Sequence, residues 1–191
     1  MQERGFDVDH STIHRWVVHY SPQLVQNFRS IKRKPAGRWR LDETYINVKR
    51  KWKYYYRAVD KYGETVDFLL TAKRDTKAAL RYLRKAIGSC WKPSLINIDQ
   101  SGANNTAIKQ YNAEESTRIK IRQCKYLNNI VEQDHRLLKR ITKLMLGFKE
   151  FRCAQATLAG IELVRMLKVG QMRCQAGMSK TPAELFYGSA G

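Results

Sequence analysis

Long hydrophobic segments are missing from this chain. No uninterrupted apolar run approaches the roughly 20 residues that a membrane-spanning helix requires. The polar, charged N-terminus also lacks the pattern of a signal peptide. We therefore expect a cytoplasmic protein that does not span a membrane.

Cysteine is sparse and scattered. The four cysteines, Cys90, Cys124, Cys153 and Cys174, form no CxxC pair and no cluster with histidine. A structural zinc site needs such closely spaced thiol and imidazole ligands. We expect reduced thiols and no zinc site.

Acidic residues are scarce as well. The chain has 17 Asp and Glu against 36 Lys and Arg, which gives a formal net charge of +19. Such a surface attracts polyanions, and nucleic acid is the commonest polyanion in a cytosol. Between Arg29 and Arg57, eleven basic residues accompany only two acids, Asp42 and Glu43. Charge alone does not choose among DNA, RNA and an acidic membrane, and a merely solubilising surface is the other interpretation.

What the chain does contain is enough apolar sequence for one good-sized core. Its 191 residues are 43 % hydrophobic, so a packed domain with a small appendage is expected. We expect four segments: a partial helix-turn-helix over residues 1–21, a basic linker over 22–38, a catalytic domain over 39–170 and a tail over 171–191.

The first segment predicts a short helix capped by Asp9. Ser11, Thr12 and Arg15 would be exposed near its start, as in a recognition helix that reads the major groove. Only four residues precede Gly5, so the helix-turn-helix is partial, and a plain surface helix is an equally good interpretation. The helix is expected to end at Ser21-Pro22, because the residue before a proline is pushed out of the α region.

From Trp39 the hydrophobic period changes between strand and helix spacing. Strands are expected over 40–49, 54–60, 65–71, 95–99 and 119–122, and helices over 74–87, 106–115, from about 130, and 148–169. Thr181 to Glu184 predicts a last helical turn. The order β-β-β-α-β-α-β-α-α is a mixed α/β pattern. A ribonuclease H-like fold, with its mixed sheet, has its elements in that order.

The helix from about residue 130 has two distinct faces. Asn128 and Asn129 precede it and are expected to cap its first turn. One side is apolar and carries Ile130, Leu137, Ile141, Leu144 and Met145. The opposite side carries Glu132, Arg136, Lys139 and Lys143. The alternative is an ordinary solvated face, in which the Glu132–Arg136 pair adds only about 0.3 kcal/mol.

Three acids are expected to meet in this fold. Asp42 lies on the first, central strand, Asp99 ends the 95–99 strand that pairs beside it, and the helix of Glu132 crosses close by. Three uncompensated carboxylates repel each other, so the arrangement makes sense only around a cation. All-oxygen ligands favour Mg²⁺ or Mn²⁺, and two ions roughly 4 Å apart would serve phosphoryl displacement. Alternatively, Asp42 pairs with Arg40, Asp99 is a turn residue, or Asp60 is the strand-end acid.

Four stretches carry a resemblance to a known family. They are RWRLDETYI around Asp42, INIDQSGANNTAI around Asp99, QCKYLNNIVEQDHRLLKR around Glu132, and LGFKEFRCAQATLAGIEL. They resemble DDE-class bacterial insertion-sequence transposases, most closely the insertion-sequence-six family, from about residue 4 to 171. The acids occur in the family's order, 57 and 33 positions apart.

The resemblance implies metal-binding catalytic roles for Asp42, Asp99 and Glu132, and contact of Lys139 with the transposon end. It also implies supporting roles for Asn128, Asn129, Asp134 and His135. Arg136 and Lys143 are expected to help hold DNA.

At the level of the whole protein, the resemblance implies a nucleoid-associated DNA transposase with two Mg²⁺ or Mn²⁺ ions. It would act as a dimer or larger homo-oligomer on terminal inverted repeats and target DNA, by replicative, cointegrate-forming transposition. No membrane and no small-molecule cofactor is implied. Relative to the family the N-terminal region is shortened, so a catalytically inactive DNA-binding protein is the main alternative, and a cellular ribonuclease H-type nuclease is the third.

Overall fold

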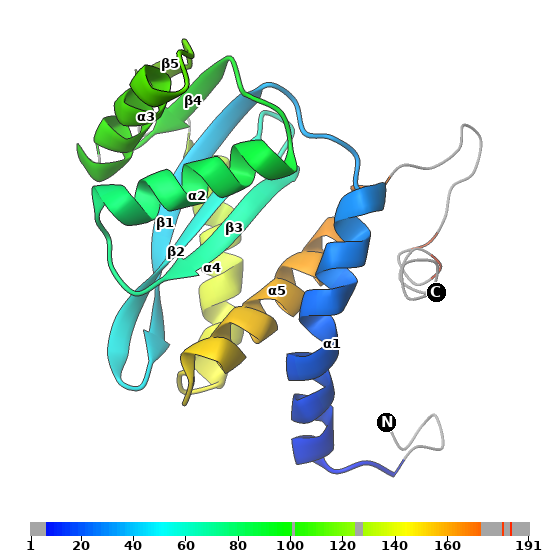
Figure 1. Ribbon diagram of the computed structural model, residues 1–191. Coiled ribbons are helices and arrows are strands. Elements are labelled where there is room, and N and C mark those ends of the chain that lie inside the picture. The colour runs from blue at the N-terminus through cyan, green and yellow to red at the C-terminus, as the bar shows by residue number, and fades with distance from the viewer. Residues whose placement is uncertain (1–6, 101, 125–127, 173–180, 182–183, 185–191) are drawn as a thin grey trace. The chain divides into compact units, whose positions relative to one another are not determined.

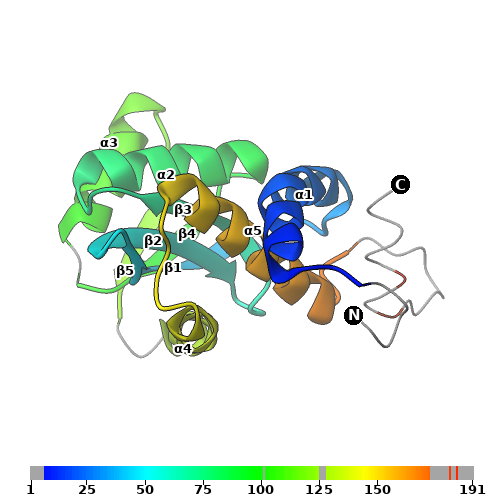
Figure 2. The same cartoon turned by 90° about the horizontal axis from the view of Figure 1, so that it is seen from below.

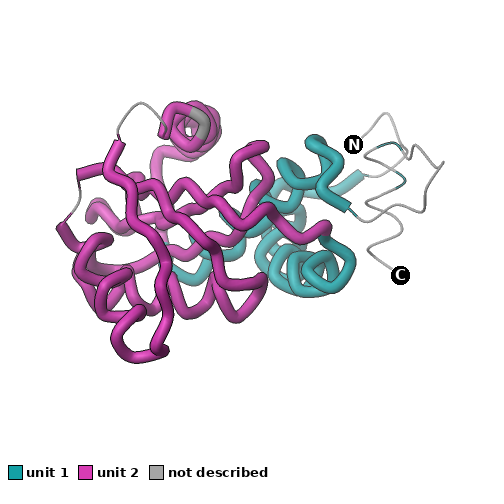
Figure 3. Tube along the Cα trace, turned by 90° about the horizontal axis from the view of Figure 1, so that it is seen from above, with its two compact units in different colours: residues 1–32, 150–191 teal, residues 33–149 magenta. Residues whose placement is uncertain are grey.

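The computed structural model describes residues 7–100, 102–124, 128–172, 181 and 184. The chain forms two compact units, one of residues 33–149 and one of residues 1–32 with 150–191 (Figure 3). Within the described residues, no helix is both long enough and apolar enough to cross a membrane.

The larger unit is built on a five-stranded mixed sheet in the order β3-β2-β1-β4-β5 (Figure 1). The strands are β1 (Arg38–Val48), β2 (Lys51–Asp60), β3 (Thr65–Thr71), β4 (Leu95–Ile98) and β5 (Lys120–Gln123). The first three form an antiparallel meander, and β4 runs parallel to both β1 and β5. This topology confirms the predicted ribonuclease H-like sheet.

Helices cover both faces of this sheet. The helices α2 (Thr76–Ser89) and α3 (Gly102–Glu114) lie on one face, and α4 (Asn129–Leu144) lies on the other (Figure 2). Asp75 caps α2, because its Oδ1 accepts from the backbone N–H of Ala78 at 2.8 Å. The two faces therefore differ: one holds the main core, and the other carries a single helix.

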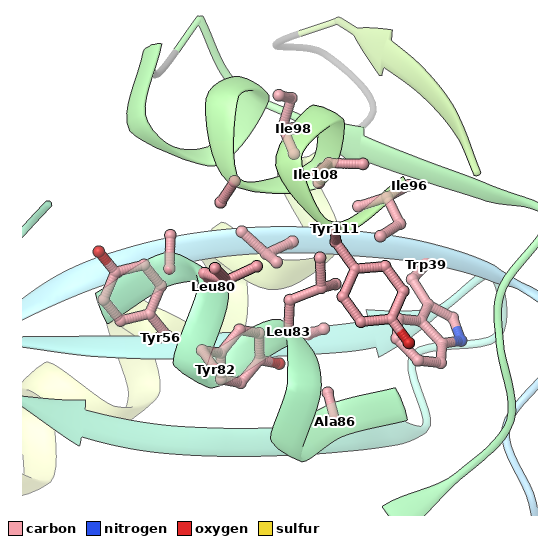
Figure 4. Packing of buried hydrophobic residues seen from close by; sticks show 14 of the residues in the cluster. Trp39, Tyr56, Leu80, Tyr82, Leu83, Ala86, Ile96, Ile98, Ile108 and Tyr111 are labelled. Atoms are coloured by element: carbon pink, nitrogen blue, oxygen red, sulfur yellow. The ribbon is translucent and has the colours of Figure 1, made fainter. Parts of the chain in front are cut away.

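The main core fills the space between α2, α3 and the sheet (Figure 4). Its largest side chains come from β1, β2, β4 and the two helices: Trp39, Tyr56, Tyr82, Ile96, Ile98 and Ile108. The rings of Tyr56 and Tyr82 are stacked with centroids 5.7 Å apart. This packing fixes β1 beside β4, and so positions the edge where the predicted acids lie.

The smaller unit pairs α1 (His10–Ile31) with α5 (Phe151–Lys168). Asp9 caps α1 as predicted, and accepts from the backbone N–H of Ser11 at 3.3 Å. At Gly160 a Cβ atom would lie 2.7 Å from the Oγ of Ser21. The missing side chain of Gly160 is what lets the two helices approach so closely.

The predicted end of α1 at Ser21-Pro22 is wrong, and so is the linker over residues 22–31. The helix continues through Pro22 to Ile31. Val25 and Phe28 continue the apolar period beyond the proline and are buried. Their burial offsets the cost of an interior proline, about 3 kcal/mol, while Pro22 itself is exposed. Residues 1–6 are outside the described residues, so the helix-turn-helix stays a prediction.

Most of the C-terminal tail also lies outside the described residues. The backbone N–H of Thr181 donates to Glu184 Oε2 at 2.7 Å, and that of Glu184 donates to Thr181 Oγ1 at 3.3 Å. This reciprocal pair is a capping box. It confirms the helical start predicted at Thr181.

Candidate active site

The predicted acids Asp42 and Asp99 lie at neighbouring positions of one sheet edge. In the parallel pair of β1 and β4, Arg40 is in register with Asn97. Asp42 lies two residues beyond Arg40, and Asp99 lies two residues beyond Asn97, just after the end of β4. The parallel register therefore brings both backbone positions to the same end of the two strands.

The N-terminal end of α4 is fastened across these two strands by asparagine side chains. The Nδ2 of Asn97, on β4, donates to Asn128 Oδ1 at 2.6 Å and to the Cys124 carbonyl at 3.0 Å. The Nδ2 of Asn128 in turn donates to the carbonyl of Leu41, on β1, at 3.3 Å. Asn97 and Asn128 are buried, so these bonds are made away from water. They hold the helix that carries Glu132 next to the edge of the sheet where Asp42 lies.

This arrangement corrects the predicted helix cap. Asn128 does occupy the position before the helix, but its side chain makes no capping bond. Its amide is used across the sheet instead, because a buried amide needs partners there and the exposed helix start can be hydrated. Asn129 is exposed as the first residue of α4.

The predicted apolar face of α4 is also wrong. The buried stripe consists of Val131, His135 and Leu138, which face the sheet. Leu137 is exposed, and Leu144 has 84 % of its surface exposed. The helix has apolar residues on two sides, so periodicity alone fits either. The bonds of Asn128 and the contact with β1 select the side with His135.

His135 contacts the first acid directly. Its Nδ1 lies 3.3 Å from Asp42 Oδ2, and both side chains are largely buried. The Nε2 of His135 has no hydrogen-bond partner among the described residues. The imidazole thus holds the carboxylate of Asp42 on the α4 side of the sheet.

A buried ion pair holds the same helix against β2. Arg57 Nη1 donates to Asp134 Oδ2 at 2.7 Å, and its Nη2 donates to Thr65 Oγ1 at 3.1 Å. Arg57 is only 1 % exposed. A guanidinium this deeply buried needs such charged and polar partners, so Asp134 serves to seat α4.

The second acid has a different neighbourhood. Glu43 follows Asp42 on β1 and therefore points to the opposite face, where Arg74 and Asn104 donate to its carboxylate. Arg74 Nη2 also lies 3.9 Å from Asp99 Oδ2. Burial raises the pKa of Glu43, with the Asn104 and Arg74 bonds opposing the rise. Burial alone would lower the pKa of Arg74, but the charge and hydrogen bond of Glu43, together with the charges of Tyr45 and Asp99, outweigh this and raise the pKa.

The three predicted metal ligands are therefore only partly assembled. Asp42 lies beside His135, Asp99 lies beside Arg74, and Glu132 is half-buried in the first turn of α4. Within the described part of the chain, no three Asp, Glu, His or Cys side chains gather closely enough to hold a metal ion. The donor chemistry of the three carboxylates nevertheless fits a hard divalent cation.

The predicted DNA-binding residues are divided between the two units. Arg136, Lys139 and Lys143 are exposed on α4, and the two lysines line a groove in the larger unit. Ser11 and Arg15 are exposed near the start of α1 in the smaller unit, where Arg15 Nη2 donates to Thr12 Oγ1 at 3.0 Å.

Asn97, Arg57 and Arg74 were not predicted as site residues. The first two did leave a signal, because each is a polar residue with apolar or aromatic neighbours on both sides in a strand: LINID contains Asn97, and YYYRAVD contains Arg57. A polar residue at a buried strand position must find a partner. Nothing in the sequence indicates which partner, and nothing singles out Arg74.

Comparison with known proteins gives both a family and a fold. The DDE domain family matches residues 36–171. The transposase for insertion sequence-like element IS431mec of Staphylococcus aureus strain Mu50 is 38 % identical over 172 residues, which is 87 % of this chain and 74 % of that protein. The transposase for insertion sequence element IS257 in transposon Tn4003, also from Staphylococcus aureus, is 37 % identical with the same coverage.

Among solved structures, the magnesium complex of the HTLV-2 integrase catalytic core domain in its dimeric form matches with a TM-score of 0.53 and 17 % identity. The match covers 80 % of this chain and 97 % of that domain. At this identity the likeness shows the fold, a ribonuclease H-like core as in retroviral integrases. The family itself rests on the sequence matches, which extend across the sheet, α4 and α5. The chain belongs to the DDE transposases of the insertion-sequence-six family.

Proposed function

We propose that this chain is the catalytic part of a metal-dependent DNA transposase. It cleaves DNA at the ends of an insertion sequence and joins the freed ends to target DNA. One observation carries the proposal: the bonds Asn97–Asn128 and Asn128–Leu41 tie together the three elements that bear Asp42, Asp99 and Glu132. The staphylococcal relatives, named as transposases of insertion elements, support the same conclusion.

Asp42, Asp99 and Glu132 hold two Mg²⁺ or Mn²⁺ ions in this proposal. When bound, such ions activate an attacking oxygen and stabilise the leaving oxygen of an in-line displacement at phosphorus. The HTLV-2 core, solved with magnesium, has the same fold. His135 orients the carboxylate of Asp42, and Arg74 orients that of Asp99.

The same site serves two displacements. In the first, water attacks the phosphorus at the element's end and a DNA 3′-hydroxyl leaves. In the second, that 3′-hydroxyl attacks a phosphodiester of target DNA, forms a new P–O bond and displaces another 3′-hydroxyl. Arg136, Lys139 and Lys143 hold the phosphates, and Ser11, Thr12 and Arg15 contact the inverted repeats. We expect a dimer or larger assembly, because two ends must be joined to one target.

Substituting the third acid tests this function. The Glu132→Gln variant keeps the size of the side chain but loses its charge. Nicking and strand transfer should fall at least ~100-fold, since a metal site supplies several kcal/mol of transition-state stabilisation. The measurement incubates labelled insertion-sequence ends with the full chain and Mg²⁺ or Mn²⁺, and separates the products on a denaturing gel.

The matched control is Glu115→Gln, which changes an exposed acid at the end of α3. It should leave both products at the wild-type level. Strand transfer by Glu132→Gln at the wild-type rate would remove Glu132 from the site. A wild-type chain that binds the ends but never nicks them with either metal would instead be the non-catalytic DNA-binding protein.

A further inference from the structure

A groove lies between the tip of the β1–β2 hairpin and the C-terminal end of α4, wholly within the larger unit. It has a volume of about 650 Å³, and Tyr45, Trp52, Lys139, Lys143 and Phe148 are among its lining residues. This volume falls in the range of small-molecule sites, roughly 300–1,000 Å³.

Two aromatic rings border the groove and are open to solvent. Trp52 has 62 % of its surface exposed and Tyr45 has 44 %. Their ring centroids are 6.4 Å apart in an edge-to-face arrangement, and Tyr45 also contacts the ring of Tyr54 at 5.4 Å. These contacts hold Tyr45 in place while one face of the aromatic cluster stays uncovered. An exposed indole beside a groove is a stacking surface for a flat ligand.

The charge around these rings is positive. Lys139 and Lys143 line the groove, and no acidic residue does among those that the structure describes. Neither lysine forms an ion pair with a residue that the structure describes. The adjacent hairpin turn adds exposed Lys49, Arg50 and Lys51. A ligand that stacks on Trp52 is therefore expected to carry negative charge.

The floor of the groove is fixed by backbone bonds. The N–H of Phe148 donates to the Asn47 carbonyl at 2.9 Å, and the N–H of Lys49 donates to the Phe148 carbonyl at 2.8 Å. Gly147 has φ +91° and lies so close to Asn47 that a Cβ atom would be 3.1 Å from its Oδ1. The segment after α4 is thus held against the end of β1, so the aromatic and basic walls are preorganised.

We propose that this groove binds an unpaired nucleobase of the DNA strand, stacked on Trp52, with its flanking phosphates on Lys139 and Lys143. The inference rests on the proposed transposase function and specifies which part of the DNA the site takes. A base–aromatic stack with lysines along the backbone is how single-stranded nucleic acid is held without sequence preference.

Charge favours DNA over a second copy of the chain as the occupant. The protein has a formal net charge of +19, and two basic grooves brought face to face repel each other. An unpaired nucleotide complements both features of the groove, because its flat ring can stack on Trp52 and its negative charge can pair with the lysines.

The test compares two DNA probes without added metal, so that binding is measured apart from cleavage. One probe is a duplex with a short 3′ overhang that carries 2-aminopurine, and the other has the same sequence fully paired. Trp52→Ala should bind the overhang probe roughly 5- to 150-fold more weakly, the range expected for losing one base stack. It should bind the paired probe as wild type does, and Trp52→Phe should restore most of the overhang affinity.

The matched control is Tyr62→Ala, because Tyr62 is an exposed aromatic beneath Lys61 in the other hairpin of the sheet. It should leave both affinities unchanged. Equal weakening of both probes by Trp52→Ala, no weakening, or the same effect from Tyr62→Ala would overturn the proposal. A lower oligomer mass for Trp52→Ala in sedimentation would make the groove a protein interface instead.

The outcome is independent of the proposed catalysis. A chain that never nicks DNA yet prefers the overhang through Trp52 keeps the groove and loses the transposase function. A chain that transfers strands normally while Trp52→Ala leaves overhang binding intact keeps the function and loses the groove.

Discussion

At the scale of single residues, buried polar side chains hold the candidate site together. Asn97 and Asn128 join β4, α4 and β1, and Arg57 joins β2 to Asp134 of α4. Each of these groups would be costly to bury alone, so each specifies one arrangement of its neighbours. The positions of the acids depend on this polar layer as much as on the apolar core.

Removing the guanidinium of Arg57 tests this layer. Arg57→Met should lower the free energy of unfolding by about 3–5 kcal/mol, because the largely buried Asp134 carboxylate loses its partner. The measurement is urea unfolding of the full chain. Asp134→Leu added to Arg57→Met should recover part of the loss, since no unpaired charge is then left.

The control for this prediction is an exposed ion pair. Arg84 pairs with Glu114 at the surface, and Arg84→Met should cost less than about 1 kcal/mol. Equal effects of the two substitutions would show that the Arg57 pair does not stabilise the attachment of α4.

At the scale of elements, α4 shows which features of a helix the spacing of its apolar residues can predict. Its start follows from the sequence, and the structure confirms it within a residue or two. The buried face does not follow, because Leu137 and Leu144 repeat at helical spacing as regularly as Val131 and Leu138 do. The hydrogen bonds at its N-terminal end and the backbone contact after its C-terminal end orient the helix on the sheet.

The contact after α4 can be tested at Gly147. Gly147→Ala should lower the free energy of unfolding by about 1–2 kcal/mol, because its φ is +91° and its Cβ would press on Asn47. Gly88→Ala is the matched control. That glycine lies inside α2, and among the described residues no atom beyond the neighbouring helix backbone lies within 4 Å of an added Cβ, so alanine should stabilise by up to about 1 kcal/mol. Thermal unfolding monitored by circular dichroism would show the opposite signs, and a shift of the same sign would contradict the contact.

At the scale of the whole molecule, the charge of +19 governs how the chain meets DNA. Most of this charge is distributed over both units and carries no sequence information. It favours binding to any duplex, whereas the acidic site and the groove that we propose would act on a single strand. Binding and specificity are therefore expected to respond differently to salt.

Affinity for duplex DNA should fall steeply with salt. For B-DNA the logarithm of the affinity falls with the logarithm of salt concentration by about 0.9 per phosphate neutralised. Lys139→Ala should reduce that slope by roughly 0.9, if Lys139 contacts phosphate as proposed. Fluorescence anisotropy across a salt series measures both slopes. Lys77→Ala, an exposed lysine of α2 on the other face of the sheet, should leave the slope unchanged, and identical slopes for all three proteins would remove Lys139 from the DNA surface.

The sequence by itself determined the element order, the excess of positive charge and the positions of Asp42, Asp99 and Glu132 along those elements. These features depend on the composition and on residues that are close together in the sequence. They therefore do not depend on how distant segments pack. Only the tertiary structure decided that α1 continues past Pro22, that Asn128 bonds across the sheet instead of capping its helix, and that His135 faces Asp42. Each of those outcomes depends on the free energy of contact between segments far apart in the chain, which no local pattern contains.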